Sequence, residues 1–261
     1  MQKILIIVAA GNSSRMGGKP KALADFDGAP VITNTINNAQ SYFNQIVVVS
    51  NEQNYDSFQE TVKRIGLTNI SVIQIKSGFG DADAVLKAVL CVKSQIGGDF
   101  DATFCWGDAI FTSSQIFDIM LQQDVETTFM RSLIVGCSID TDPYAYFDVY
   151  TENGDFEKML IKQSYFQKLN GHISIGVHDQ CIFRAYTAFL IEALRSYQLA
   201  LGYDGENYAL SNKNEMGLLN SFSFLHNKGV SCVVRLLPSG NVYSFNTVDE
   251  LEKIRHKLLN R

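Results

Sequence analysis

The sequence predicts an α/β fold, with a mostly parallel central sheet flanked by helices and an antiparallel region in its second half. Up to residue 131, short apolar runs alternate with helix-patterned segments, which is typical of a parallel sheet. The strand-like runs are apolar on both faces, as expected where helices cover both sides of a sheet. From residue 132, strand-like runs follow one another with turn residues between them, which indicates antiparallel strands.

The first half alternates strands and helices along the chain. Strands are expected at 4–10, 45–50, 71–75 and 103–106, and helices at 30–42, 54–66 and 82–94. The run at 4–10 is the longest apolar run, and seven residues are too few to span a membrane. No small-residue cleavage site follows it, so it predicts a first strand and not a signal peptide.

The second half is richer in strands. They are expected at 133–139, 145–150, 156–162, 173–177, 230–236 and 242–245, with helices at 185–201, 215–226 and from 248 onward. Asn153 and Gly154 predict a hairpin turn between the second and third of these strands. We expect a single domain over residues 1–261, made of the halves 1–131 and 132–261.

Composition excludes several classes of protein. Lys and Arg number 22 against 27 Asp and Glu, and the resulting net charge of −5 argues against a nucleic-acid-binding surface. The five cysteines are widely spaced in apolar segments without a CxxC pair, which indicates reduced thiols and a cytoplasmic protein. The four histidines lack the spacing of zinc ligands. Nothing in the sequence indicates an oligomeric state.

A loop rich in glycine and cations follows the first strand. Residues 9–21 contain three glycines, two serines and the cations Arg15, Lys19 and Lys21. Consecutive backbone N–H groups in such a turn form an anion-binding nest, and the cations add the charge that a triphosphate needs. The alternative is an ordinary solvated loop, but this density of glycine and cations directly after a buried strand favours phosphate. The pattern is neither GxGxxG nor GxxxxGK[ST], which argues against a dinucleotide-dependent oxidoreductase and a P-loop kinase.

The segment Ala-Ala-Gly-Asn-Ser-Ser-Arg-Met-Gly-Gly-Lys-Pro-Lys at 9–21 resembles the signature loop of nucleotidyltransferases that make activated sugars and alcohols, a family that includes MobA-like and sugar nucleotidyltransferases. Three further segments match the family in the same order: the Gly-rich segment 77–84, Trp-Gly-Asp at 106–108, and 244–252. The resemblance implies a Rossmann-like fold with a nucleotide-binding half, 1–131, and an acceptor-binding half, 132–261.

The same resemblance implies the reaction. A Mg²⁺-dependent enzyme of the pyrophosphorylase type would condense a nucleoside triphosphate with a phosphorylated sugar or alcohol and release pyrophosphate, in the synthesis of activated precursors for cell-surface glycans. Its partners would be small molecules, with neither nucleic acid nor a membrane among them.

Individual roles follow from the matching positions. The resemblance makes Arg15 and Lys21 catalytic, Asp108 and Asn246 the Mg²⁺ ligands, and assigns the nucleotide and acceptor contacts to other residues. The nucleotide-binding residues would be Ala9, Ala10, Gly11, Asn12, Ser13, Ser14, Gly78, Gly80, Asp81 and Asp83, and the acceptor-binding residues Lys162 and Gly176. Carboxylate and amide oxygens are hard ligands that suit a hard cation.

Several of these residues also have a purely structural explanation. Asp108 follows a strand and is a favourable residue for a turn or a helix N-cap. Asn246 precedes Thr247 and Glu250, which have the spacing of a helix capping box. Lys162, at the end of a predicted strand, has the alternative of being a solvated edge residue.

The residues expected near the base favour CTP. The carboxylates of Asp81 and Asp83 can only accept hydrogen bonds, and cytosine offers an N4 amino donor where uracil offers a carbonyl. The short spacing from Arg15 to Pro20 also resembles cytidylyltransferases. The alternative for each aspartate is a cap on the helix that begins near Ala84.

Three other functions compete with this interpretation. A uridylyltransferase acting on a sugar 1-phosphate would share most of these residues, and a non-catalytic nucleotide-binding module would need no metal pair. A glycosyltransferase would need an Asp-x-Asp pair after a strand, but the two candidates, at 81–83 and 140–142, lie at a helix start and in a turn. We therefore discount the glycosyltransferase.

Overall fold

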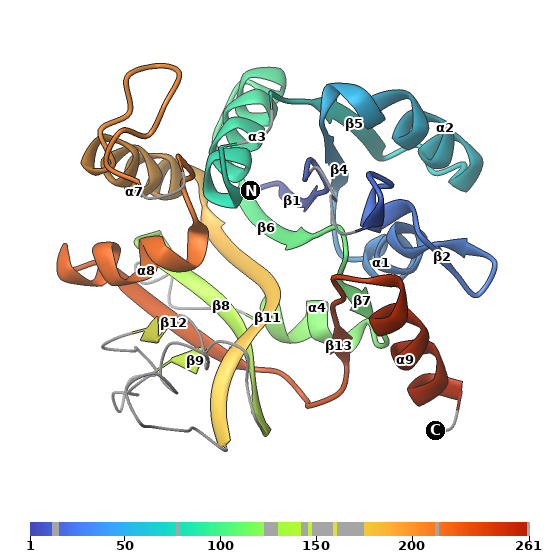
Figure 1. Ribbon diagram of the computed structural model, residues 1–261. Coiled ribbons are helices and arrows are strands. Elements are labelled where there is room, and N and C mark those ends of the chain that lie inside the picture. The colour runs from blue at the N-terminus through green and yellow to red at the C-terminus, as the bar shows by residue number, and fades with distance from the viewer. Residues whose placement is uncertain are drawn as a thin grey trace.

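The computed structural model describes residues 1–11, 16–76, 79–122, 130–141, 146–147, 159–160, 175–211 and 214–259. Four parallel strands form the centre of its sheet in the order β6-β1-β4-β5 (Figure 1). They are β1 (Lys3–Val8), β4 (Gln45–Ser50), β5 (Ile70–Gln74) and β6 (Asp101–Trp106). Every side chain from Ile4 to Ile7 is fully buried, as a strand covered on both faces requires. The predicted mostly parallel sheet is confirmed.

Helices cover both faces of this sheet. Ile4 and Ile6 of β1 pack in a core with one set of helices, whereas Leu5 and Ile7 pack in a second core with the other set. The first set is α3 (Asp81–Ile96), α7 (Thr187–Ala200) and α8 (Leu218–Asn227), and the second is α1 (Val31–Ala39), α2 (Tyr55–Ile65) and α4 (Gln115–Met120). This alternation along β1 is the two-residue period of a β-strand.

The second half extends the sheet with antiparallel strands, as predicted. β11 (Ile175–Tyr186) runs antiparallel to β6 and to β8 (Ser132–Thr141), whereas β12 (Ser231–Leu236) pairs with β8 in parallel, which the sequence did not predict. The short strands β9 (Tyr146–Phe147) and β10 (Met159–Leu160) are antiparallel, with Met159 opposite Phe147. The turn predicted between them at Asn153 and Gly154 lies outside the described residues.

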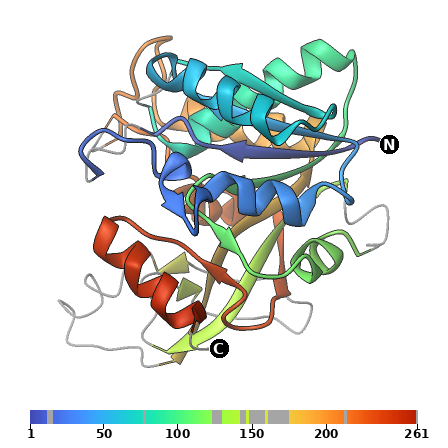
Figure 2. The ribbon, with the colours of Figure 1, turned by 90° about the vertical axis from the view of Figure 1, so that its right-hand side faces the viewer.

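The last helix, α9 (Val248–Leu259), closes one side of the molecule. Leu251 and Ile254 of α9 pack against Val31 of α1 and Ile110 of β7 (Ile110–Phe111). β7 pairs with β13 (Val242–Tyr243), which leads into the helix. Figure 2 shows α9 on the same side of the molecule as α1. The chain therefore returns at its end to the region that follows β1 and β6.

Two elements differ from the prediction in ways that matter for the site. β11 continues to Tyr186, where the sequence predicted a strand ending at 177 and a helix from 185. A bulge shifts its register between Asp179 and Phe183, and Cys181 has a φ of 58°, so the alternating pattern of a strand is interrupted. α8 begins at Leu218 and not at 215, because the residues before it run against the start of α3.

The structure also contains several short elements that were not predicted from the sequence. They are η2 (Lys21–Leu23), β2 (Asp25–Phe26), β3 (Ala29–Pro30), η3 (Glu52–Asn54), β7, and α4. β2 and β3 form a hairpin over Asp27 and Gly28, both with positive φ, which is the two-residue turn that hairpins favour.

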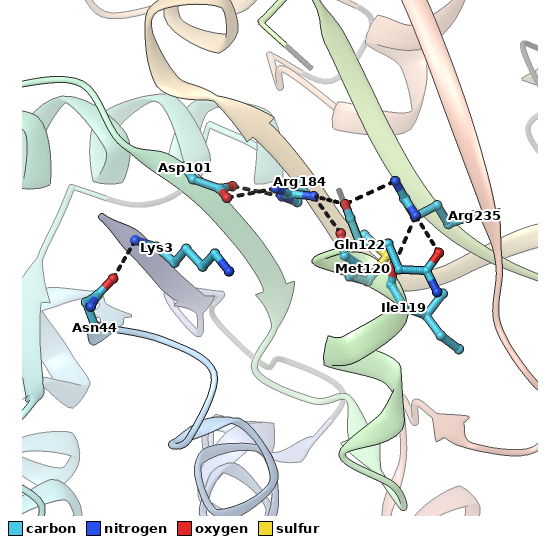
Figure 3. Close-up of polar contacts among 8 residues, drawn as sticks. All are labelled: Lys3, Asn44, Asp101, Ile119, Met120, Gln122, Arg184 and Arg235. Atoms are coloured by element: carbon cyan, nitrogen blue, oxygen red, sulfur yellow. Dashed lines mark hydrogen bonds and ion pairs between the residues drawn. The ribbon is translucent and has the colours of Figure 1, made fainter. Parts of the chain in front are cut away.

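Two arginines hold the carboxyl end of α4 (Figure 3). Arg184 of β11 donates two hydrogen bonds of 2.9 Å to the carboxylate of Asp101 in β6, and a third of 2.9 Å to the carbonyl of Met120. Arg235 of β12 donates to the side chain of Gln122 at 2.9 Å. These bonds satisfy carbonyls that a helix end leaves free and tie α4 to three strands.

Among the described helices, none has the length and apolar character needed to cross a membrane.

Candidate active site

The site lies at the carboxyl edge of the parallel strands, where β1 and β6 end side by side. Val8 is opposite Trp106, and the N–H of Gly107 donates to the carbonyl of Val8 at 2.9 Å. The segments that follow, beginning at Ala9 and Gly107, therefore meet at one edge. In open α/β sheets this edge is where ligands bind.

Glycine is required at position 107 by the closeness of these segments. A Cβ atom there would lie 2.8 Å from the Cβ of Ala9 and 3.0 Å from the Cβ of Ala22. Neither alanine can move away easily, because Ala22 is buried in η2. The small residues at 9, 22 and 107 thus bring Asp108, the next residue, within reach of Lys21.

The structure brings together three of the predicted site residues. Lys21 Nζ donates to Asp108 Oδ2 at 2.7 Å and to Asn246 Oδ1 at 3.1 Å. The side chains of Lys21 and Asp108 are 20% and 21% exposed, so the ion pair faces solvent and is open to a ligand. These residues come from η2, from the turn after β6 and from the segment before α9, which are far apart in the sequence.

The predicted capping box is present, and it fixes Asn246. The hydroxyl of Thr247 accepts from the N–H of Glu250 at 3.2 Å. The Glu250 carboxylate accepts from the N–H of Asn246, one residue earlier than in a standard capping box. The structural and the functional explanation therefore both hold, since the cap holds the backbone of Asn246 while its side chain points to Lys21.

The donor set suits a hard cation. Two oxygens, Asp108 Oδ2 and Asn246 Oδ1, converge on one point, where the Lys21 ammonium supplies positive charge. No cluster of three His, Cys, Asp or Glu side chains able to hold a metal exists among the described residues. A metal here would rely on waters and substrate phosphates for its other ligands, which is how Mg²⁺ is commonly bound.

Burial and negative charge keep the nearby thiols protonated. Burial raises the pKa of Cys105, and the Asp108 carboxylate raises it further. Burial also raises the pKa of Cys181 well above its usual value, and the charges of Asp179 and Asp108 act in the same direction. These thiols are therefore poor nucleophiles.

A cleft of about 720 Å³ extends from Asn246 between β11 and α9. Its volume is within the range of small-molecule sites. Among the residues that line it are His178, Asp179, Cys181, Tyr243, Asn246 and Glu250. The bulge in β11, with its strained Cys181, thus borders this cleft, as bulges beside binding sites often do.

The remaining predicted residues have varied positions. Ala9 and Ala10 follow β1, and Gly11 is exposed with open space around it. Gly80 begins α3, with Asp81 and Asp83 in its first turn. Gly176 lies in β11, opposite Asp140 of β8. Outside the described residues lie Asn12, Ser13, Ser14, Arg15, Gly78 and Lys162.

The two aspartates expected near the base already have partners in the protein. Asp83 is 1% exposed, and its two oxygens bind Tyr208 and Lys87. Oδ1 of Asp81 accepts from the backbone N–H groups of Ala82 and Leu218. The predicted alternative of a helix cap describes Asp81 but not Asp83, which binds two side chains, and the argument for cytosine loses the contribution of Asp83.

Asn51, which was not predicted from the sequence, contacts the start of the segment that follows β1. Asn51 is 3% exposed, and its Nδ2 donates to the carbonyl of Ala10 at 3.2 Å. Its Oδ1 accepts from the N–H of Asn54 at 3.0 Å and so caps η3. Its position in the sequence could have identified it, because a polar residue directly after β4 lies at the same carboxyl edge of the sheet as the loop after β1.

The fold and this edge of the sheet define the class of nucleotidyltransferase folds. Residues 5–130 match the family model of the MobA-like NTP transferase domain. The predicted resemblance is thereby confirmed. No curated protein sequence matches the chain.

Solved structures of nucleotidyltransferases match over nearly the whole chain. One is a nucleoside-diphosphate-sugar pyrophosphorylase from Vibrio cholerae RC9, 15% identical, with a TM-score of 0.71 over 97% of this chain and 99% of that chain. Another is the inositol-1-phosphate CTP transferase from T. maritima, 13% identical, with a TM-score of 0.70 over 99% of this chain and 96% of that chain. At these identities the likeness shows the shared fold.

Proposed function

We propose that this protein is a Mg²⁺-dependent nucleotidyltransferase. It transfers a nucleoside monophosphate from a nucleoside triphosphate to a phosphorylated sugar or alcohol and releases pyrophosphate. The observation that carries the proposal is the convergence of Lys21, Asp108 and Asn246 at the edge of the sheet directly beside the loop after β1. A lysine between two potential metal ligands is suited to a reaction in which phosphate charge must be neutralised.

Each of these residues has a distinct role in the proposed reaction. Lys21 would leave its partners to contact the α-phosphate, where negative charge grows as the acceptor oxygen attacks in line. Arg15 and the backbone N–H groups of residues 11–17 would hold the β- and γ-phosphates. Asp108 and Asn246 would hold Mg²⁺, which supplies charge neutralisation between nucleotide and acceptor. No general base is needed, because the attacking phosphate is already an anion.

The acceptor would occupy the cleft beyond Asn246. The cleft adjoins the proposed reaction centre and is lined by polar groups from β11 and α9, which suits a phosphorylated polar molecule. Lys162 and Gly176, from the acceptor half, remain the proposed contacts for its phosphate. Synthesis of a precursor for cell-surface glycans is the role that this acceptor class would serve.

CTP is the proposed nucleotide, with UTP as the competitor. Two features support this choice: the short spacing from Arg15 to Pro20, and the CTP-dependent activity in the name of one structural neighbour. Asp81 does not add to this argument, since its Oδ1 binds backbone N–H groups. A cytoplasmic location agrees with the five cysteines, all of which are described and free of disulfides.

The test is a pyrophosphate-release assay with each of the four nucleoside triphosphates against a panel of phosphorylated acceptors, with Mg²⁺ or EDTA. The proposal predicts Mg²⁺-dependent pyrophosphate release that needs both an acceptor and a preferred nucleotide, with CTP above UTP. A preference for UTP would identify a uridylyltransferase. Nucleotide binding without pyrophosphate release for any acceptor would indicate a binding module and refute the enzyme.

A further inference from the structure

The start of α3, where the base is expected, is paired with the connection between α7 and α8. The N–H of Met216 donates to the carbonyl of Phe79 at 2.7 Å, and the N–H of Ala82 donates to the carbonyl of Met216 at 3.0 Å. Gly80, between them, has a φ of 96°, and a Cβ atom there would lie 2.4 Å from the Met216 oxygen. Only glycine permits this approach.

Asp81 joins the amino ends of two helices. Its Oδ1 accepts from the N–H of Ala82 in α3 at 2.9 Å and from the N–H of Leu218 in α8 at 2.7 Å. Burial raises the pKa of Asp81, and these backbone hydrogen bonds act against that rise. The carboxylate therefore holds α8 in place against the turn, since both N–H groups belong to helix ends that need an acceptor.

Asp83, two residues further along α3, binds the same connection. Its Oδ1 accepts from the hydroxyl of Tyr208 at 2.7 Å, and its Oδ2 pairs with Lys87 Nζ at 2.6 Å. Gln198 of α7 donates to the Tyr208 hydroxyl at 3.1 Å, and Tyr208 is 1% exposed. A buried carboxylate with a partner on each oxygen is unavailable to a ligand, and it anchors whatever it binds.

We propose that residues 208–211 and 214–218 act as a brace that positions the nucleotide-binding turn 79–81, with Tyr208 and Asp81 as the positioning residues. The inference deepens the proposed function, because it assigns to these residues the geometry of the base site and not the choice of base. The brace belongs to the acceptor half of the chain, while the turn belongs to the nucleotide half. Leu219, directly after the brace, lines the cleft beside Asn246, so the brace also borders the proposed acceptor site.

Positioning and base reading predict different results. A positioning role predicts that weakening the brace lowers the affinity for every nucleotide alike, because the whole turn loses its shape. A base-reading role predicts a loss confined to the preferred nucleotide. The ratio of the CTP and UTP affinities therefore separates the two roles, and a residue important only for folding would alter neither affinity.

The first experiment measures CTP and UTP dissociation constants by calorimetry, without acceptor, for the wild type, Tyr208→Phe and Tyr203→Phe. Tyr203 is the matched control, because its hydroxyl donates to Gly205 in the same connection and has no bond to α3. In Tyr208→Phe, both dissociation constants should rise about tenfold with their ratio unchanged, and amide exchange at residues 79–84 should accelerate. Tyr203→Phe should match the wild type.

The second experiment compares Asp81→Asn with Asp81→Ala. Asparagine retains the oxygen that accepts from Ala82 and Leu218, so it should rescue binding of both nucleotides, whereas alanine should not. A changed CTP-to-UTP ratio in Tyr208→Phe or in Asp81→Asn would overturn the inference, and so would unchanged affinities in Tyr208→Phe. A wild type that binds no nucleotide would refute the proposed function itself. This failure is distinguishable from failure of the brace, because it is seen with the wild type before any variant is measured.

Discussion

Replacing Lys21 by methionine would remove the ammonium group and keep most of the side-chain volume. In the structure this ammonium lies 2.7 Å from Asp108 Oδ2 and 3.1 Å from Asn246 Oδ1, at the centre of the proposed reaction site. If Lys21 stabilises the charge that develops on the α-phosphate, its loss should lower kcat by about 10²-fold or more, equivalent to about 3 kcal/mol of transition-state stabilisation. The assay is steady-state pyrophosphate release at saturating nucleotide and acceptor.

The same substitution should have little effect on stability. Both side chains of the ion pair are about one-fifth exposed, and exposed ion pairs contribute roughly 0–1 kcal/mol to the free energy of unfolding. For a chain of this size, that corresponds to a fall in Tm of at most about 4 °C. A large loss of kcat with a small change in Tm would therefore locate the effect of Lys21 in catalysis.

A matched control is provided by Lys93, which pairs with Asp99 at 2.7 Å and lies at the far end of α3. Its side chain is 36% exposed, so Lys93→Met removes a comparable ion pair away from the site. We expect a similarly small change in Tm and an unchanged kcat. Wild-type turnover in Lys21→Met, or an equal loss of turnover in both variants, would refute the reasoning.

Three further predictions concern the metal, the backbone and pH. Activity should vanish with EDTA and return with Mg²⁺, and Asp108→Asn should reduce it far more than Asp249→Asn; the reverse order would mean that the wrong carboxylate was chosen. Gly107→Ala should lower the free energy of unfolding by about 1–3 kcal/mol and reduce kcat, as measured by denaturant unfolding and turnover, because the new Cβ would lie 2.8 Å from Ala9. Burial raises the pKa of Asp179 above its usual 3.8, so the folded protein binds a proton on this carboxyl group more tightly than the unfolded chain does. The folded protein therefore loses stability as the pH rises through the raised pKa and the carboxyl group ionises. The Tm of Asp179→Asn relative to the wild type should therefore increase as the pH rises above the usual pKa of 3.8, and a constant difference would contradict this.

The periodic parts of the fold could be predicted from the sequence because local pattern and tertiary environment agree there. β4 has the predicted bounds, and α2 differs by one residue at each end, since its apolar face and the glycine after it mark it clearly. β11 was misjudged because its bulge at Cys181 breaks the alternation of side chains. The position of a bulge depends on the neighbouring strands, and a local sequence pattern does not contain that information.

The site shows the same division. Lys21, Asp108 and Asn246 were predicted from their match to the family segments, and Lys21 and Asp108 lie together because strand ends of a parallel sheet meet at one edge. The partners of Asp83 could not, because Tyr208 lies 125 positions away in a polar loop without periodicity. Contacts of this kind depend on how loops pack. From the sequence alone, Asp83 was predicted to bind the nucleotide, whereas in the structure its partners are protein side chains.

The central claim is that the acceptor attacks the α-phosphorus of the nucleotide. It is tested most directly by following two labels, one on the α-phosphate and one on the γ-phosphate of the preferred nucleotide, through a reaction with the preferred acceptor. The account predicts that the α-label appears in a product joined to the acceptor while the γ-label leaves as pyrophosphate. A γ-label on the acceptor would indicate a kinase, and an α-label released as free nucleoside monophosphate would indicate hydrolysis; either result would contradict nucleotidyl transfer.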